Sequence, residues 1–463
     1  MLATEPRAGP LPIPAIVPTH DVEPVPPYRP VPVGTRLRRH AWLLLLPTAF
    51  AVYSTSFAGI PVIERTHSVL GDADAANFAV LLRGFRLGHR YGNEYAAQHR
   101  GLGDNAQKHK LHHVLYAAIG GALHRAAAPL YRLAGAPPGR ALYAVNALVA
   151  VANLLLLAAL LRRANPRGNA VFPFLLFYAA ALGTWVFSSV PESWPFSATL
   201  VLGYLLLLLR RPLPPAAAMG ALLGVVMLNN VFLAALGVLL ALALYAAGGA
   251  RRMARGTAVA AAAAVAAWAG GLAVLSAWDG SFRPDRFVRF TLWFKQFTGA
   301  DLPRTDPYVW KSAASNLFVN SVVSQQPDPR MPQEALLATL RGGGLGLAAT
   351  LAWAALACAA AVLLARALLA VLRERGPRAA AADPGTAAAL WCVTMLGVTV
   401  VLFYPSGFLY STVVVPAIAV ALCRALDLRA GWQRGLLYAT LALMLANNLE
   451  QVLHFRAALL ALH

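Results

Sequence analysis

Two aspartates, Asp72 and Asp74, follow the first apolar stretch of the chain that is long enough to cross a membrane. Acidic residues are scarce, with 19 Asp and Glu among 463 residues, so a pair just outside a span needs a chemical reason. A carboxylate there can take a proton from an attacking hydroxyl or bind a divalent cation. A further acid, Glu192, follows Pro191 in a short turn between two apolar runs, where it could instead cap the following helix.

Histidines gather in the same region as the aspartates. Segment 63–140 holds seven of the 11 histidines of the chain. On a helix, His109 faces His112 and His113 at spacings of three and four residues, and such a spacing can bind zinc or copper. We favour hydrogen bonds and phosphate contacts at the membrane surface, because no cysteine and no His-Glu-x-x-His motif accompanies these histidines.

Polar residues of two later regions are also candidates for binding. Asn229 and Asn230 interrupt a long apolar run, where buried amides serve helix packing or a sugar hydroxyl. Segment 278–341 alternates aromatic with basic residues, among them Lys295 and Arg304. That mixture is ordinary at membrane interfaces, and it equally suits a clamp for a lipid phosphate with aromatic platforms for sugar rings.

The composition is that of an integral membrane protein. Hydrophobic residues make up 59% of the chain, charged residues only 13%, and the mean hydropathy is +0.58. The net charge of +20 comes from arginines in short clusters between apolar runs, which is how a multi-pass protein marks its cytoplasmic loops. This pattern argues against nucleic-acid binding.

Apolar runs of about 20 residues, the length that crosses the hydrocarbon as a helix, recur along the chain. All six arginine clusters fall on one side only if 215–229 and 230–247 cross separately. We therefore predict about 11 transmembrane helices in residues 36–463, with a cytoplasmic N-terminus and an external C-terminus, after a Pro-rich, disordered cytoplasmic tail at 1–35. The predicted spans are roughly 41–62, 141–161, 168–188, 195–210, 215–229, 230–247, 256–277, 343–372, 386–404, 408–426 and 435–455. The clusters are Arg36/Arg38/Arg39, Arg162/Arg163/Arg167, Arg210/Arg211, Arg251/Arg252/Arg255, Arg373/Arg375/Arg378 and Arg424/Arg429/Arg434.

This topology leaves two long external segments, 63–140 and 278–341. The stretch 111–134 is apolar but contains His112, His113 and Arg125. A charge at the bilayer centre costs about 2.5–3.5 kcal/mol on insertion scales, so we predict an amphipathic helix on the external membrane surface.

Several short motifs together resemble the C-type glycosyltransferases, which are multi-span enzymes that use polyprenyl-phosphate-linked sugars. The resemblance runs from about residue 40 onward. It departs from the family where prolines are absent near His109 and where the Tyr404–Tyr410 loop lacks an acid. The motifs are Asp74 four residues before Phe78, an amphipathic helix ending near Gly88, His109-Lys110-Leu111, Pro191-Glu192, the broken pair around Asn229-Asn230, and Tyr404-Pro405-Ser406-Gly407-Phe408-Leu409-Tyr410.

The resemblance implies an all-α, multi-pass fold and an inverting sugar transfer on the external face of a bacterial cytoplasmic (inner) membrane. It implies Asp74 as general base, with Asp72 as helper or metal ligand and Glu192 as second acceptor or metal contact. Mg or Mn is implied only if the enzyme is metal-dependent. The remaining implied contacts to the lipid-linked donor are His109, His113, Asn229, Asn230, Lys295 and Arg304.

Two other functions stay open. A transporter or flippase for a lipid-linked or anionic substrate would need charges near mid-membrane, and often an internal repeat, and we find neither in the sequence. A non-catalytic relative would not need a carboxylate pair and a His-rich segment on one face.

Overall fold

The part of the chain that the structure describes is entirely helical. The structure is a computed structural model, and within its described residues it contains no strand. The predicted all-α class is confirmed. The described residues are 41–58, 60, 114–133, 140–209, 233–278, 305–323, 343–400, 408 and 410–461.

Four of the described helices are long and apolar enough to cross a membrane. Each contains an apolar window with few charged residues, and the chain is therefore a multi-pass membrane protein. These helices are α8 (Arg140–Ala164), α13 (Leu233–Trp278), α17 (Gly344–Ala381) and α20 (Gly431–Ala461).

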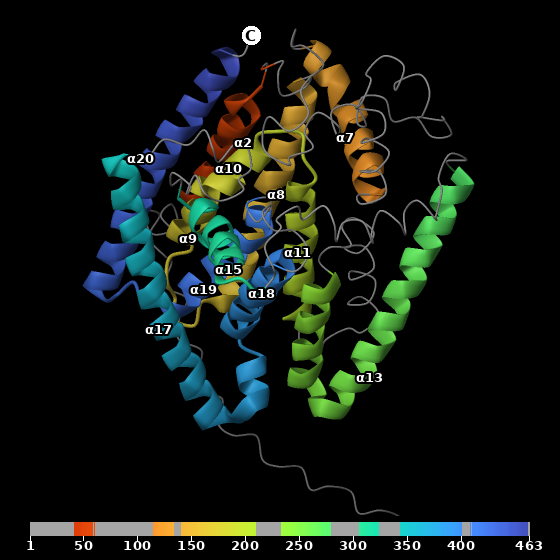
Figure 1. The fold of residues 1–463 in the computed structure, drawn as a ribbon, viewed down its shortest axis with the longest axis vertical. Helices are drawn as coiled ribbons and strands as arrows, with labels where there is room; N and C mark the ends of the chain where they lie inside the picture. The colour runs from red at the N-terminus through yellow and green to blue at the C-terminus, as the bar shows by residue number, and fades with distance from the viewer. Residues whose placement is uncertain are drawn as a thin grey trace, which may run out of the picture. The chain divides into compact units, whose positions relative to one another are not determined.

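Shorter apolar helices pack among the long ones (Figure 1). Proline in the first turn starts several of them, because its fixed φ suits that position and no hydrogen bond is lost there. The shorter elements are η1 (Ala41–Leu44), α2 (Leu45–Ser56), α9 (Phe172–Ala180), α10 (Leu182–Ser188), α11 (Trp194–Leu208), α15 (Pro307–Ala314), the π-helix η3 (Ser315–Asn320), α18 (Pro384–Val398) and α19 (Ser411–Ala425).

The predicted span 168–188 is not one continuous helix. It breaks at Ala181, whose φ of −58° and ψ of 133° are extended, into α9 and α10. Leu182 N–H donates to the Val322 carbonyl (3.3 Å). The Asn448 amide donates to the Ala180 carbonyl (2.9 Å) and to that of Val322 (2.8 Å). Irregular backbone at membrane depth is tolerated when neighbouring helices satisfy its polar groups in this way.

Glycine bends two of the long helices. Gly249 inside α13 has a φ of 75° and Gly376 inside α17 has a φ of 79°, values that glycine adopts without the steric cost of a Cβ. α13 consequently consists of two limbs that meet at Gly249 (Figure 1).

Arginine clusters from several helices lie together at one end of the described helices, which we call the arginine end. The Arg162 guanidinium lies 5.0 Å from the centre of the Trp42 ring. Arg163 Nη1 donates to the Leu206 carbonyl at the end of α11 (2.7 Å), and Arg167 Nη1 donates to the Arg424 carbonyl at the end of α19. These contacts join the start of the α2 region to the ends of α8, α11 and α19.

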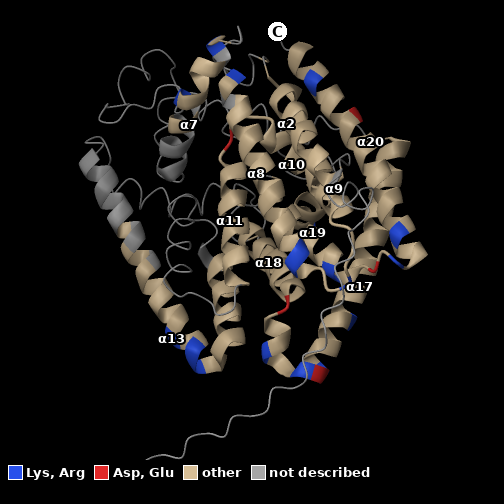
Figure 2. Cartoon of the chain, turned by 180° about the vertical axis from the view of Figure 1, so that it is seen from behind, with Lys and Arg blue, Asp and Glu red and all other residues tan. Residues whose placement is uncertain are grey.

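The α17–α18 connection and the bend of α13 belong to the same end. Arg424 pairs with Asp383, which begins α18. The Arg378 guanidinium lies so close to Gly249 that a Cβ there would be 2.6 Å from Nη2. Figure 2 shows basic residues at both bends. For the four clusters among the described residues, this gathering agrees with the predicted sidedness; the clusters at Arg36/Arg38/Arg39 and Arg210/Arg211 lie outside those residues.

The other ends of α2 and α20 meet far from the arginine end. Arg456 Nη1, near the end of α20, donates to the carbonyls of Thr55 (2.9 Å) and Ser56 (2.6 Å) at the end of α2. Both helices therefore run away from the arginine end, as the predicted orientation requires. The count of 11 stays a prediction, because residues 210–232 lie outside the described residues.

Residues 114–133 form a helix, α7 (Val114–Leu133), which packs against α8. Leu130 and Leu133 are exposed. α7 is not among the described helices that are apolar enough to cross a membrane. Its position on the membrane surface stays a prediction.

Candidate functional site

Glu192 lies in the buried turn between α10 and α11. Only 1% of its surface is exposed, and the flanking Ser189 and Ser193 are buried as well. An acidic side chain is rarely this buried unless it is paired or functional. The turn is therefore the described region best suited to chemistry.

α8 holds this turn in place through one side chain. The Asn146 amide Nδ2 donates to the carbonyls of Val190 (2.6 Å) and Glu192 (2.7 Å). Asn146 and Arg163 are 17 positions apart on α8, which is about 25 Å along a helix axis. Because the hydrocarbon core is about 30 Å thick, the turn lies near the opposite membrane boundary from the arginine end.

A second motif of the sequence packs along α10 and its turn. Phe408 lies with its ring centre 5.3 Å from that of Phe187 on α10. Tyr410 meets Trp194 edge-on at 5.0 Å, directly after Glu192 and Ser193. The Pro191-Glu192 turn and the end of the Tyr404–Tyr410 loop are thus neighbours in space.

The start of α19 reaches the start of α10 equally closely. A Cβ added to Gly183 would lie 1.9 Å from Ser411 Oγ, so the absence of a side chain at Gly183 allows the approach. The Gly183 N–H also donates to the Ser321 carbonyl (2.9 Å). α10 is therefore enclosed by α19 and by the end of η3.

Four buried hydroxyls on these elements have no hydrogen-bond partner within the part of the chain that the structure describes. They belong to Thr184, Ser193, Ser411 and Thr412. Such groups are uncommon in proteins, and each needs an explanation, such as water, a ligand or strain. We call Glu192 and these four residues the polar site.

The end of α2 contacts α10, the helix that precedes the Glu192 turn. Trp185 Nε1 on α10 donates to Ser56 Oγ at the end of α2 (2.9 Å), and Ile60 is buried beyond it.

The remaining predicted site residues lie outside the described residues. Their roles stay predictions. They are Asp72, Asp74, His109, His113, Asn229, Asn230, Lys295 and Arg304.

No group of three or more His, Cys, Asp or Glu that could hold a metal is found among the described residues. Glu192 is the described member of the predicted pair of metal contacts, and Asp72 lies outside the described residues. One buried carboxylate is compatible with a divalent cation as a single oxygen ligand, but it does not by itself form a site.

Sequence analysis missed the polar groups that position the Glu192 turn and α10. Asn146, Asn448 and Ser411 stand inside or at the ends of apolar runs, and their partners are far away in the chain. A polar residue within an apolar run is expensive unless it is paired, and this signal would have singled out both asparagines.

Comparisons with known proteins give no family for the chain. No family model matches it, and no curated protein matches. Two crystal structures of ArnT from Cupriavidus metallidurans match with 16% identity, over 91% of this chain and 77% of that one. The structure bound to undecaprenyl phosphate has a TM-score of 0.48, and the apo structure has one of 0.49. Because a similarity this low carries no argument about function, the proposal below depends on the residues of the chain.

Proposed function

We propose that the protein is a membrane glycosyltransferase that moves a sugar from a polyprenyl-phosphate-linked donor to an acceptor hydroxyl on the external face. One observation carries the proposal. The Pro191-Glu192 turn and the end of the Tyr404–Tyr410 loop, two motifs on which the family resemblance depends, meet in a buried polar site. That site lies far from the arginine end. Its free hydroxyls could pair with hydroxyls of the sugar.

The proposed transfer is a substitution at the anomeric carbon and involves no oxidation or reduction. The acceptor oxygen attacks the anomeric carbon from the face opposite the phosphate, so the configuration inverts. The bond between that carbon and the phosphate oxygen breaks, and its electron pair leaves with the lipid phosphate. Asp74 takes the proton of the acceptor hydroxyl as general base. The phosphate is already a stable anion, so no strong general acid is needed.

The other groups have supporting roles in this proposal. Asp72 assists Asp74 or binds a metal, and Glu192 accepts a hydrogen bond from the substrate or contacts the same ion. Mg²⁺ or Mn²⁺, where used, would supply positive charge to the leaving phosphate. Lys295 and Arg304 would stabilise the same charge, together with His109 and His113. Asn229 and Asn230 would bind sugar hydroxyls.

The test is a profile of glycans and polyprenyl lipids in cells that carry Asp74→Asn, Asp72→Asn or the wild-type protein. We expect Asp74→Asn to remove the product and to raise the level of lipid-linked sugar, since general bases contribute about 10²–10⁴-fold. Asp72→Asn should have the smaller effect. Unchanged products in both variants, at normal protein levels, would remove the proposal.

A further inference from the structure

The π-helix η3 reaches in among the membrane helices, although it belongs to segment 278–341, which the sequence predicts to be external. Trp353 Nε1 on α17 donates to the Phe318 carbonyl of η3 (2.8 Å). Trp353 lies nine positions from Gly344, the first residue of α17, which is about 14 Å along the helix axis. η3 therefore contacts α17 well inside its length, and not at its end.

The end of η3 pairs with the start of α10 through backbone hydrogen bonds. The Gly183 N–H donates to the Ser321 carbonyl (2.9 Å), and the Leu182 N–H donates to the Val322 carbonyl (3.3 Å). Both N–H groups belong to the first turn of α10, where a helix has no partners of its own for them. Carbonyls from another part of the chain thus complete the start of α10.

The Asn448 amide on α20 holds the same junction. It donates to the carbonyl of Ala180, where α9 ends (2.9 Å), and to that of Val322 (2.8 Å). The Val322 carbonyl is also the acceptor for the Leu182 N–H. Asn448 is fully buried, and a buried amide that lost its acceptors would be costly. The two bonds therefore fix η3 and the end of α9 relative to each other.

The helix α10 is consequently fixed at both ends. Asn448 and η3 fix its start, and Asn146 fixes the turn at its other end through the carbonyls of Val190 and Glu192. α10 has seven residues, all of them buried, and is about 10 Å long. Because densely packed interiors transmit strain, a displacement at the start of α10 is passed on to the Glu192 turn.

We infer that Asn448 is a positioning residue for the proposed transfer, and that it acts through α10 on Glu192. The inference rests on the proposed function, in which Glu192 contacts the substrate or its ion. A misplacement of about 1 Å costs up to about 10²-fold in rate even when its cause is far from the chemistry. Misplacing Glu192 cannot cost more than removing its charge, so the loss of Asn448 has at most the effect of Glu192→Gln.

The test is a double-mutant cycle with Asn448→Leu and Glu192→Gln in the full chain. Leucine is close to asparagine in size but cannot donate a hydrogen bond. Product is measured in cell membranes, which contain the native donor, per amount of folded protein. We expect Asn448→Leu to lower transfer about tenfold beside Glu192, and to change it less than about twofold in the Glu192→Gln background. A purely structural role would lower transfer by the same factor in both backgrounds.

Asn169→Leu is the matched control at the arginine end. Asn169 is also a buried asparagine that joins distant segments, since its Nδ2 donates to the Leu426 carbonyl (2.8 Å) and its Oδ1 accepts from the Leu428 N–H (3.0 Å). This variant should lose stability as Asn448→Leu does, and keep its transfer per folded protein.

A second variant decides the question if Asn448→Leu does not fold. Trp353→Phe keeps an aromatic ring but removes the hydrogen bond to η3. Its transfer should fall about threefold, as for the loss of one neutral hydrogen bond, and again only while Glu192 is present.

Equal effects of Asn448→Leu in both backgrounds would overturn the inference. Full transfer by a folded Asn448→Leu, or an equal loss of transfer in Asn169→Leu, would do the same. These outcomes leave the proposed function standing, because the Asp74→Asn and Asp72→Asn profiles test it separately. Unchanged products in both aspartate variants would instead remove the proposed function, and the positioning role with it.

Discussion

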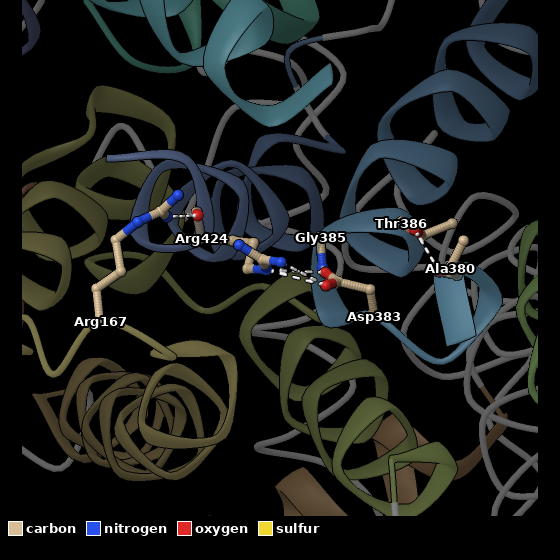
Figure 3. Close-up of polar contacts among 6 residues, drawn as sticks. All are labelled: Arg167, Ala380, Asp383, Gly385, Thr386 and Arg424. Carbon is tan, nitrogen blue, oxygen red and sulfur yellow. Dashed lines mark hydrogen bonds and ion pairs between the residues drawn. The ribbon is translucent and has the colours of Figure 1, made fainter. Parts of the chain in front are cut away.

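The ion pair of the arginine end and the hydroxyls of the polar site differ in how their buried polar groups are paired. At the arginine end, the Asp383 carboxylate accepts from Arg424 Nε (3.1 and 3.0 Å) and Nη2 (2.8 Å) and from the Gly385 N–H (2.8 Å). Figure 3 shows how this network continues through Arg424 to Arg167. At the polar site, Thr184 and Ser411 have no hydrogen-bond partner among the described residues. Complete pairing of the Asp383 carboxylate indicates a structural role. The unpaired hydroxyls require water, a ligand or strain, and the predictions below test the ligand.

Helix ends explain why the ion pair is placed where it is. Asp383 precedes the first turn of α18, and Arg424 lies in the last turn of α19. A carboxylate is favoured at a helix N-terminus and a cation at a C-terminus, since each complements the helix dipole. The pair therefore joins two helix ends and stabilises both.

The first prediction concerns the separation of the two regions, and its expected effect is all-or-none. Reporter fusions at residues 135 and 165 flank α8, so they should report opposite sides of the membrane, with 165 cytoplasmic. Activity of a phosphatase and a fluorescent reporter, one for each compartment, measures this. If the reporter at residue 165 is external, the arginine end is not cytoplasmic and the predicted surface position of 111–134 is wrong.

The second prediction tests the structural role of the arginine end. Arg424→Ala leaves the Asp383 carboxylate, whose side chain is 10% exposed, without its cation. Breaking one partner of a buried pair costs about 3–5 kcal/mol, so we expect a large fall in the unfolding temperature in detergent. The exposed Arg429→Ala is the matched control and should change little.

A double variant separates the ion pair from lost packing. Arg424→Met with Asp383→Asn removes both charges, while asparagine can still cap α18. This protein should recover most of the stability that Arg424→Ala loses. A single variant as stable as Arg429→Ala would contradict the structural role of the pair.

The third prediction tests the functional role of the polar site. Glu192→Gln keeps the size of the side chain, and Asn146 bonds to the backbone carbonyl of residue 192, so the turn should stay folded. We expect transfer to fall about tenfold to a hundredfold, as for loss of a hydrogen bond to a charged group, about 1.5–3 kcal/mol, with little change in unfolding temperature. Product formation in membranes measures it, and the exposed Glu450→Gln on α20 is the control. Full activity in the Gln variant would leave Glu192 a structural residue.

Sequence patterns predicted those parts of the molecule that follow from local composition. Apolar length predicted α8, α17 and α20, and arginine clusters predicted which helix ends lie together. The break at Ala181 was missed because its partners, Val322 and Asn448, are distant in sequence. Scarcity of charge in an apolar chain singled out Glu192, which is buried, and its role stays a prediction.

The hydroxyls of the polar site could not be predicted from sequence. Ser411 and Thr412 look like ordinary small residues at the start of an apolar run. Their lack of partners is a property of the packing of α10 against α19, as the close approach of Gly183 illustrates. Composition reports how many polar groups a chain has, but only tertiary structure reports which of them are paired.

The last prediction has the smallest expected effect and addresses that pairing directly. Ser411→Ala and Thr412→Val each remove a buried hydroxyl that has no partner within the described residues. A buried group without a hydrogen bond costs about 1–3 kcal/mol, so its removal should leave the unfolding temperature unchanged or raise it. Transfer should fall about fivefold to tenfold, the loss of one hydrogen bond to substrate.

Thr199→Val supplies the control, because it removes a hydroxyl that is paired. Thr199 Oγ1 donates to Asn153 Oδ1 (2.6 Å) and to the Pro195 carbonyl (3.0 Å). Its loss should lower the unfolding temperature and leave transfer nearly intact, which is the reverse of the Ser411→Ala pattern. If Thr199→Val and Ser411→Ala lost stability alike, the Ser411 hydroxyl would be paired, as the Asp383 carboxylate is. The difference between the two regions would then carry no information about function.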